Sequence, residues 1–142
     1  MLDRDGGYGA ITRTRRDAGI DCRHYNPNSR NVRALGFEGS LEDQDGWGAV
    51  LTSEALEHLV DPWALLRAAA VRTDLVIATT AVVQDPVPPL DSWWYAAPEH
   101  EKHISFYSAR SLRRIASEPG TDCVPAGSMH VFALGITQFR GH

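Results

Sequence analysis

The sequence predicts an α/β protein whose mostly parallel sheet is flanked by helices. Short apolar runs alternate with helical patterns along the chain, as in proteins whose parallel strands are joined by crossover helices. The chain has 142 residues, 43% of them hydrophobic and 23% charged. This length and composition are typical of one globular domain with one core. We therefore expect a single domain over residues 1–142.

The first elements surround a cluster of glycines. Leu2–Asp3 predicts the last part of a truncated first strand, which runs into the turn Gly6–Gly9. A helix is expected over Ala10–Ala18, because Gly19 stands where a helix stops. A second strand is expected over Ile20–Tyr25.

The middle of the chain predicts the centre of the sheet. A short third strand is expected at Phe37–Gly39 and a buried one at Trp47–Ser53. The periodicity is helical from Glu54 to about Val71, and Asp61–Pro62 interrupts it, which predicts one helical turn, a break and a longer helix. Leu75–Val83 is apolar and β-branched, which predicts another buried strand.

The last third begins with a long loop, Gln84–Tyr107, and loops of this length are usually lids or binding loops. Ser108 is a suitable N-cap for a helix that ends near Pro119. Two strands, Cys123–Val124 and Met129–Ile136, are expected to form an antiparallel pair.

Charge and composition exclude several classes of protein. The net charge of −4 argues against a broad surface for duplex nucleic acid. No apolar run reaches the ~18 residues of a membrane span, and the N-terminus lacks a secretory signal, so we expect no membrane partner and a cytoplasmic location. The two cysteines, Cys22 and Cys123, are far apart and predict two buried thiols.

Two segments carry residues suited to chemistry. Glycines in the turn that includes Gly6–Gly9 let backbone approach a ligand, although an ordinary tight turn explains them equally well. If a helix begins near Glu54, then Glu54, Glu57 and His58 share one face and could hold Mg, Mn or Zn. Helical spacing alone favours a plainer explanation, in which the acidic residues face the helix dipole.

The histidines and the aromatic run offer further candidates. Without a metal, His58 or His103 is the candidate general base, because imidazole titrates near neutral pH. Trp93–Tyr95 could form an aromatic wall for a sugar or base ring, or pack as a lid over the sheet edge.

Several segments together resemble a known family. They are Leu2–Gly9 with Asp17–Asp21, Thr52–Pro62, Trp93–Tyr95 and His103–Ser108. In order and spacing they resemble class I S-adenosylmethionine-dependent methyltransferases, in the branch of small domains often found beside sugar-modifying enzymes. The resemblance implies a Rossmann-like sheet that binds the cofactor at the carboxyl ends of its strands.

The resemblance places Asp3, Gly7 and Gly9 on the cofactor loop and Asn26 at the ribose. Asp5 stands where the family has its first glycine, and Asn26 where it has an acidic residue. Relatives carry more strand and usually a helix ahead of this motif. We therefore expect one methyltransferase-like domain over residues 1–142, whose short first strand could reflect a mis-assigned start, a fragment that is incomplete at its N-terminus, or a degenerate copy. A homodimer could cover the resulting edge or gap in the sheet.

The stretch His103–Ser108 is also similar to a loop of the small-RNA 2′-O-methyltransferases. Those enzymes and the ubiquinone-pathway O-methyltransferases carry a Glu-x-x-Glu-His motif that holds a metal against substrate hydroxyls. By this resemblance Glu54, Glu57, His58 and His103 would be metal ligands. The metal would lower the pKa of a bound hydroxyl.

The sequence thus predicts methyl transfer from S-adenosylmethionine to a hydroxyl of a sugar or another small polar acceptor. One alternative is a catalytically degenerate interaction module, which Asp5, Asn26 and the short first strand favour. The other is a metal-assisted RNA 2′-O-methyltransferase, favoured by the metal motif and by the arginines of residues 13–16.

Overall fold

The computed structural model describes residues 1–43, 45–96, 103–118 and 120–134. Its strands are β1 (Leu2–Arg4), β2 (Arg23–Tyr25), β3 (Val50–Ser53), β4 (Leu75–Thr79), β5 (Asp122–Ala126) and β6 (Met129–Ala133). Its α-helices are α1 (Ala10–Asp17), α2 (Pro62–Ala70) and α3 (Ala109–Ser117), and its 3₁₀ turns are η1 (Leu56–His58) and η2 (Trp94–Ala96).

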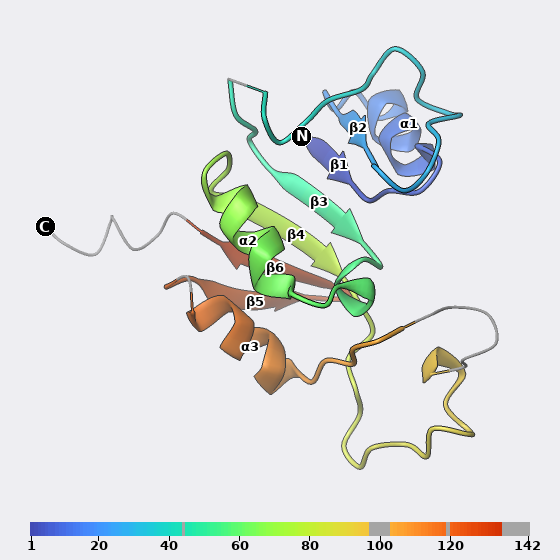
Figure 1. Cartoon of the computed structure of the whole chain (residues 1–142), viewed down its shortest axis with the longest axis vertical. Coiled ribbons are helices and arrows are strands. Elements are labelled where there is room, and N and C mark those ends of the chain that lie inside the picture. Colours follow the sequence, from blue (N-terminus) through green and yellow to red (C-terminus); the bar gives the residue numbers. More distant parts are fainter. Residues whose placement is uncertain (44, 97–102, 119, 135–142) are drawn as a thin grey trace, which may run out of the picture.

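The six strands form one sheet in the order β2-β1-β3-β4-β6-β5 (Figure 1). The first four strands are parallel, and β6 runs antiparallel to both β4 and β5. The chain leaves β1 toward β2 and returns on the other side of β1 to form β3. Strand order therefore reverses at β1, and open α/β sheets bind ligands beyond the carboxyl ends of strands at such a point.

Strand β1 is short, but it is paired along its whole length. Leu2–Arg4 matches Arg23–Tyr25 on one side and Val50–Thr52 on the other. The expected gap or open edge at the first strand is therefore wrong, because β1 lies inside the sheet. Leu2 is fully buried and belongs to the main core.

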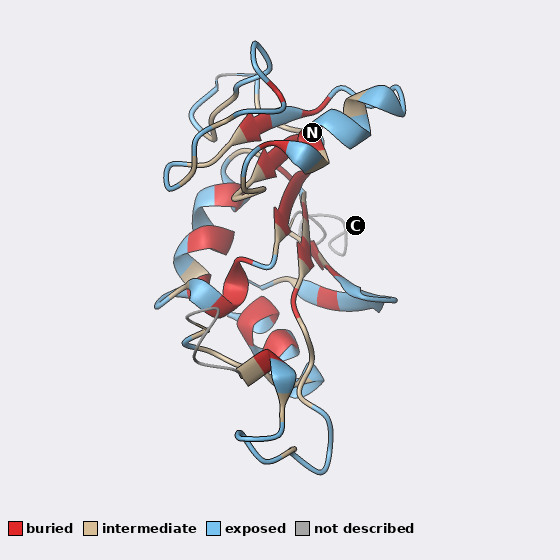
Figure 2. Ribbon diagram, turned by 90° about the vertical axis from the view of Figure 1, so that its right-hand side faces the viewer, coloured by how far each residue is buried: buried red, intermediate tan, exposed pale blue. Residues whose placement is uncertain are grey.

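The helices lie on both faces of the sheet. Crossovers between parallel strands are right-handed. The connection from β1 to β2 moves along the sheet one way and that from β3 to β4 moves the other way, so their helices α1 and α2 lie on opposite faces. Helix α3 shares the face of α2, since Leu66 and Leu112 belong to one core cluster with Phe132 of β6. In Figure 2 the buried faces of these two helices lie against the same side of the sheet.

Most predicted elements are confirmed. The helix expected after the glycine turn is α1, and Gly19 follows it with a φ of 82°. Ser108 caps α3 in a capping box with Ser111, as its position predicted. The strand pair at the C-terminal side is β5 and β6, although residues 135 and 136 lie outside the described part. The third strand expected at residues 37–39 is reduced to one parallel bridge between His24 and Glu38.

The helical turn, the break and the longer helix expected over residues 54–71 are confirmed, but the start of the turn is corrected. Glu54 has a φ of 49°, in the left-handed region, so no helix begins there. One 3₁₀ turn, η1, follows at Leu56–His58, and α2 starts only at Pro62 behind the N-cap Asp61. Among the described residues, no helix has both the length and the apolar character needed to cross a membrane.

Candidate functional site

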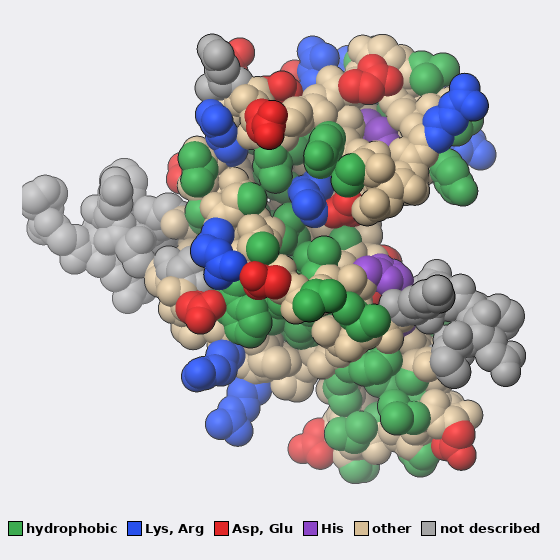
Figure 3. Space-filling view, viewed as in Figure 1, with side chains coloured by type: hydrophobic (Ala, Val, Ile, Leu, Met, Phe, Trp, Pro, Cys, Tyr) green, Lys and Arg blue, Asp and Glu red, His purple; other side chains and the backbone are tan. Residues whose placement is uncertain are grey.

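The carboxyl ends of the four parallel strands lie at one edge of the sheet. Beyond them the chain continues into the glycine turn after β1, Asn26 after β2, Glu54 after β3 and Thr80 after β4. Figure 3 shows a hollow between the part that carries β1, β2 and α1 and the part below it, with histidine side chains above and below. Two groups of residues face this region: the glycine turn and a cluster around η1.

The glycine turn is built on a buried carboxylate. Asp3 is fully buried, and its Oδ2 accepts hydrogen bonds from the backbone N–H and the hydroxyl of Thr12 at 3.1 and 2.8 Å. A Cβ on Gly6 would lie 2.2 Å from the Asp3 carboxylate oxygens. Burial raises the pKa of Asp3, while the bonds from Thr12 lower it. Asp3 thus supports the turn from beneath, and only a glycine fits above it.

The sequence places Gly6 in the turn but does not predict that this position requires glycine, because the family resemblance points to Gly7 and Gly9. Of the predicted glycines, Gly7 has a φ of 60° and open space where its Cβ would be. Gly9 has a φ of 89°, and its Cβ would lie 2.6 Å from Oδ1 of Asn31. Gly9 is therefore required by packing within the chain, whereas Gly7 leaves room beside the turn.

Asp5 occupies a position that favours glycine. Its φ is 65°, a left-handed conformation that side chains with a Cβ adopt at a cost. Its carboxylate forms an ion pair with the guanidinium of Arg4, and both side chains are largely buried. Burial raises the pKa of Asp5, Arg4 lowers it and the nearby Asp3 raises it further. The added charge thus has its own counterion.

Asn26, the predicted ribose contact, follows β2 at the same edge. Its side-chain oxygen accepts a hydrogen bond from the backbone N–H of Asn28 at 2.9 Å. This closes a small turn that an aspartate would also form.

The second group centres on η1, which a distant segment holds in place. The carbonyl of Glu57 accepts hydrogen bonds from the N–H groups of Ile104 and Ser105 at 2.8 and 3.1 Å. The Tyr107 hydroxyl donates to the carbonyl of Leu56 at 2.8 Å. The end of the long loop is therefore bound to the turn that follows β3.

This arrangement brings three of the four predicted ligands together. Ligand atoms of Glu57, His58 and His103 all lie within 4.8 Å of one another. Glu57 is fully buried, and its Oε2 has no hydrogen-bond partner in the described part of the chain. Glu54 is not a member of this group, although its carboxylate lies within hydrogen-bond reach of that of Glu57.

Tyr95 joins the members of the cluster. Its hydroxyl lies 2.5 Å from Oε1 of Glu57 and 3.4 Å from Oε2 of Glu54. The hydroxyl oxygen of Tyr95 also accepts a hydrogen bond from the backbone N–H of Ala81 at 3.2 Å, and the hydroxyl proton is donated to Glu57. Burial and the bond to Glu57 raise the pKa of Tyr95. Tyr95 is therefore a fixed donor.

The backbone of Tyr95 also orients His103. Its carbonyl lies 2.7 Å from Nδ1 of His103. A carbonyl only accepts hydrogen bonds, so Nδ1 carries the proton and Nε2 is the basic nitrogen of the neutral ring. The rings of His58 and His103 lie 4.9 Å apart.

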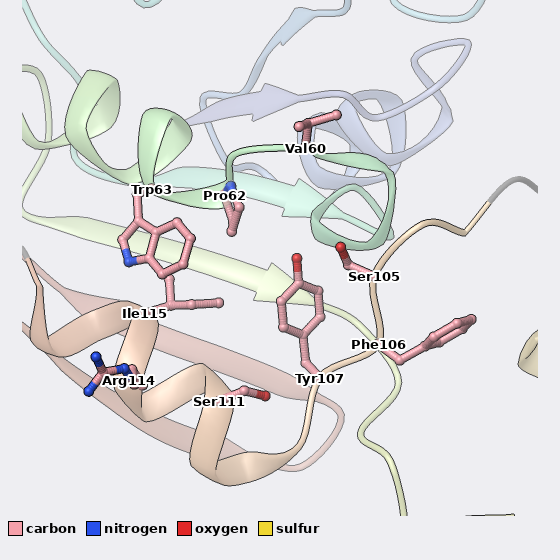
Figure 4. Close-up of a pocket in the computed structure, with 9 residues that line it drawn as sticks. All are labelled: Val60, Pro62, Trp63, Ser105, Phe106, Tyr107, Ser111, Arg114 and Ile115. Carbon is pink, nitrogen blue, oxygen red and sulfur yellow. The ribbon is translucent and has the colours of Figure 1, made fainter.

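Two pockets adjoin this cluster. One of about 550 Å³ lies at the ends of β3 and β4 and includes Glu54, Trp94 and His130 in its walls. The other, of about 480 Å³, lies between α2, α3 and the segment 105–107 (Figure 4). Tyr107 and Trp63 form part of its wall, on the side of the core.

Comparison with known proteins agrees with the fold. A family model described as a methyltransferase domain matches residues 2–126. No curated protein matches the chain. Magnesium protoporphyrin IX methyltransferase from Synechocystis PCC 6803, solved with bound SAH, has 15% identity and a TM-score of 0.59. The match covers 92% of this chain and 71% of that one.

Two other solved structures are similar. A methyltransferase in complex with the Trm112 methyltransferase activator of Haloferax volcanii has 14% identity and a TM-score of 0.61, over 94% of this chain and 81% of that one. An O-methyltransferase family 2 protein from Planctomyces limnophilus, in complex with apigenin, has 17% identity and a TM-score of 0.53. The match covers 92% of this chain and 48% of that one. The chain has the fold of these methyltransferases, and it belongs to the methyltransferase-domain family.

Proposed function

We propose that this protein transfers the methyl group of S-adenosylmethionine to a hydroxyl oxygen of a sugar or another small polar acceptor. The grouping of Glu57, His58 and His103 beside the carboxyl ends of the parallel strands carries this proposal. The open space beside Gly7 supports cofactor binding at the first turn, and the pairing of Asp5 with Arg4 removes the main electrostatic objection to it.

The chain would act mainly by alignment. When bound, S-adenosylmethionine supplies an activated methyl group that forms a bond to the acceptor oxygen as its bond to sulfur breaks and leaves a thioether. His103, with Nδ1 held by the Tyr95 carbonyl, accepts the hydroxyl proton at Nε2. His58 lies against His103 and is the second candidate base. Holding the reactants in line supplies most of the acceleration.

As the alternative to a histidine base, we propose that Glu57, His58 and His103 hold a divalent metal, in which case the two histidines are ligands and not bases. The unpartnered, buried Oε2 of Glu57 fits this role, because a buried carboxylate oxygen needs a cation or a donor. Two imidazoles and one carboxylate suit Zn or Mn better than Mg. The metal would lower the pKa of the acceptor hydroxyl and orient it.

Two of the three arginines on α1 pair with acidic residues of the chain, which favours a small acceptor over RNA. Arg13 pairs with Asp17, whereas Arg16 pairs with Asp21 and stacks on the ring of Phe37 at 3.6 Å. These guanidinium groups are engaged within the chain.

The test is cofactor binding by calorimetry, followed by transfer of a labelled methyl group to a panel of sugars and phenols. We expect binding in the micromolar range or weaker, and transfer that falls at least tenfold in His103→Ala while cofactor affinity is unchanged. A folded sample that gives no heat at millimolar cofactor contradicts the enzymatic proposal and favours the interaction module. EDTA and re-addition of Zn or Mn test the metal separately.

A further inference from the structure

The pocket at the ends of β3 and β4 has the composition of a site for a ring that carries hydroxyl groups. Its volume is about 550 Å³, and the turn between β5 and β6 closes one side. Polar groups and one large aromatic surface share its walls: Glu54, Thr79, Trp94, Tyr95, Ser128 and His130. Ligand sites commonly combine such a surface with a few directed polar groups.

Trp94 offers an open aromatic surface in this pocket. It is 80% exposed, although it stands in a segment whose neighbour Tyr95 is buried. Trp93 behaves differently: its ring lies 5.1 Å from Phe106 and 5.6 Å from Tyr95, and it does not line the pocket. Trp93 therefore packs against neighbouring aromatic rings, whereas Trp94 lines the pocket. Of these two tryptophans, only Trp94 can stack on a ring bound there.

Glu54 gives the pocket a hydrogen-bond acceptor close to the reactive cluster. Burial and the neighbouring Glu57 raise the pKa of Glu54. The hydroxyl of Tyr95 lies 3.4 Å from Oε2 of Glu54 and 2.5 Å from Oε1 of Glu57, and the two carboxylates also lie within hydrogen-bond reach of each other. A ligand that is hydrogen-bonded to Glu54 therefore lies next to Glu57. A carboxylate can accept two neighbouring hydroxyl groups at once, one on each oxygen.

We propose that this pocket is the acceptor site, and that it takes a ring with vicinal hydroxyl groups. Trp94 packs against the face of the ring, and Glu54 accepts hydrogen bonds from its hydroxyls. A sugar and a catechol share this chemistry. The assignment as acceptor site rests on the proposed function, whereas binding of the ring depends on the pocket alone.

The experiment is saturation-transfer NMR on the whole chain with SAH present, using methyl α-D-glucopyranoside and catechol as separate probes. We expect at least one probe to bind and to weaken at least tenfold in Trp94→Ala and about threefold or more in Glu54→Gln. Leu90→Ala is the matched control, because Leu90 is 65% exposed in the same loop but does not line the pocket. Melting temperatures verify that each variant is folded.

Each outcome is decisive. If only the glucoside responds, the acceptor class is a sugar, and if only catechol responds, it is a phenol. Binding of neither probe overturns the proposal, as does a Trp94→Ala variant that binds like Leu90→Ala. If the probes bind and depend on Trp94 but calorimetry detects no cofactor binding, the ring site stands and the proposed function fails.

Discussion

The glycine turn and the cluster around Tyr95 lie at the same edge of the sheet but are built in opposite ways. The turn is local, because its hydrogen-bonded residues Asp3 and Thr12 are only nine positions apart in the sequence. It depends on the backbone conformation and on the absence of a side chain at Gly6. The cluster joins distant segments, with Tyr95 and Glu57 38 positions apart. Directed side-chain hydrogen bonds define it.

The difference predicts different vulnerabilities. Added volume should damage the turn, because a carboxylate lies directly beneath Gly6. A lost hydrogen-bond donor should damage the cluster, because its carboxylate is buried. Substitutions at each region can test whether this division holds.

The largest effect is expected for Gly6→Ala. The new Cβ would collide with the Asp3 carboxylate and break its bonds to Thr12, so we expect a loss of about 3 kcal/mol in the free energy of unfolding. Cofactor affinity should fall on the order of 100-fold at the same time. Chemical denaturation and calorimetry measure the two effects.

Gly7→Ala is the matched control for added volume. It meets open space and has only its positive φ to accommodate, so it should cost about 1 kcal/mol. Equal losses of stability in Gly6→Ala and Gly7→Ala would contradict the claim that added volume above Asp3 causes the damage.

Tyr95→Phe is expected to be next in size. It leaves the Ala81 N–H and one oxygen of the buried Glu57 without their partner, for a loss of about 2 kcal/mol. The turnover rate should fall more than tenfold with cofactor affinity unchanged, because the turn is untouched. Tyr8→Phe is the control: this tyrosine is 64% exposed, so stability should change by less than about 0.5 kcal/mol. A fall in cofactor affinity in Tyr95→Phe would show that the two regions are coupled.

The sequence predicted the local region better than the distant one. The glycine turn, α1 and the cap at Ser108 depend on neighbours in the chain, whose effects sequence patterns capture. The requirement for glycine at position 6 was not predicted, because it arises from the side chain of Asp3, which reaches back under the turn. A motif of alternate glycines does not contain that contact.

The cluster could be predicted only in part. The grouping of Glu57 and His58 with His103 follows from the family resemblance, but the helical argument for Glu54 was wrong. Tyr95 was expected only as part of an aromatic wall. Its role as donor depends on the folding of a loop across the ends of β3 and β4, and no local spacing encodes that approach.

Asp5→Gly should stabilise the turn by about 1 kcal/mol, since glycine adopts a φ of 65° without strain. Burial raises the pKa of Asp5 above its usual 3.8, so its favourable contribution to stability is present below pH 3.8 and is lost as pH rises through the raised pKa. The gain from Asp5→Gly should therefore be larger at pH 7 than at pH 4. Denaturation at both pH values measures this. A variant less stable than the parent at pH 7 would mean that the Arg4 pair outweighs the strain.

The smallest effect is expected for Asn26→Asp. The small turn with Asn28 survives the change because aspartate accepts the same backbone hydrogen bond. The new charge would strengthen a hydrogen bond to a ribose hydroxyl by about 0.5–1 kcal/mol, which raises cofactor affinity about two- to fivefold. Calorimetry measures the change, and Asn28→Asp, nearby on the exposed side of the turn, controls for charge alone. A similar gain in both variants would mean that general electrostatics, not a ribose contact at residue 26, sets the affinity. A gain confined to residue 26 would place the ribose beside β2, in the region where local sequence and structure agree best.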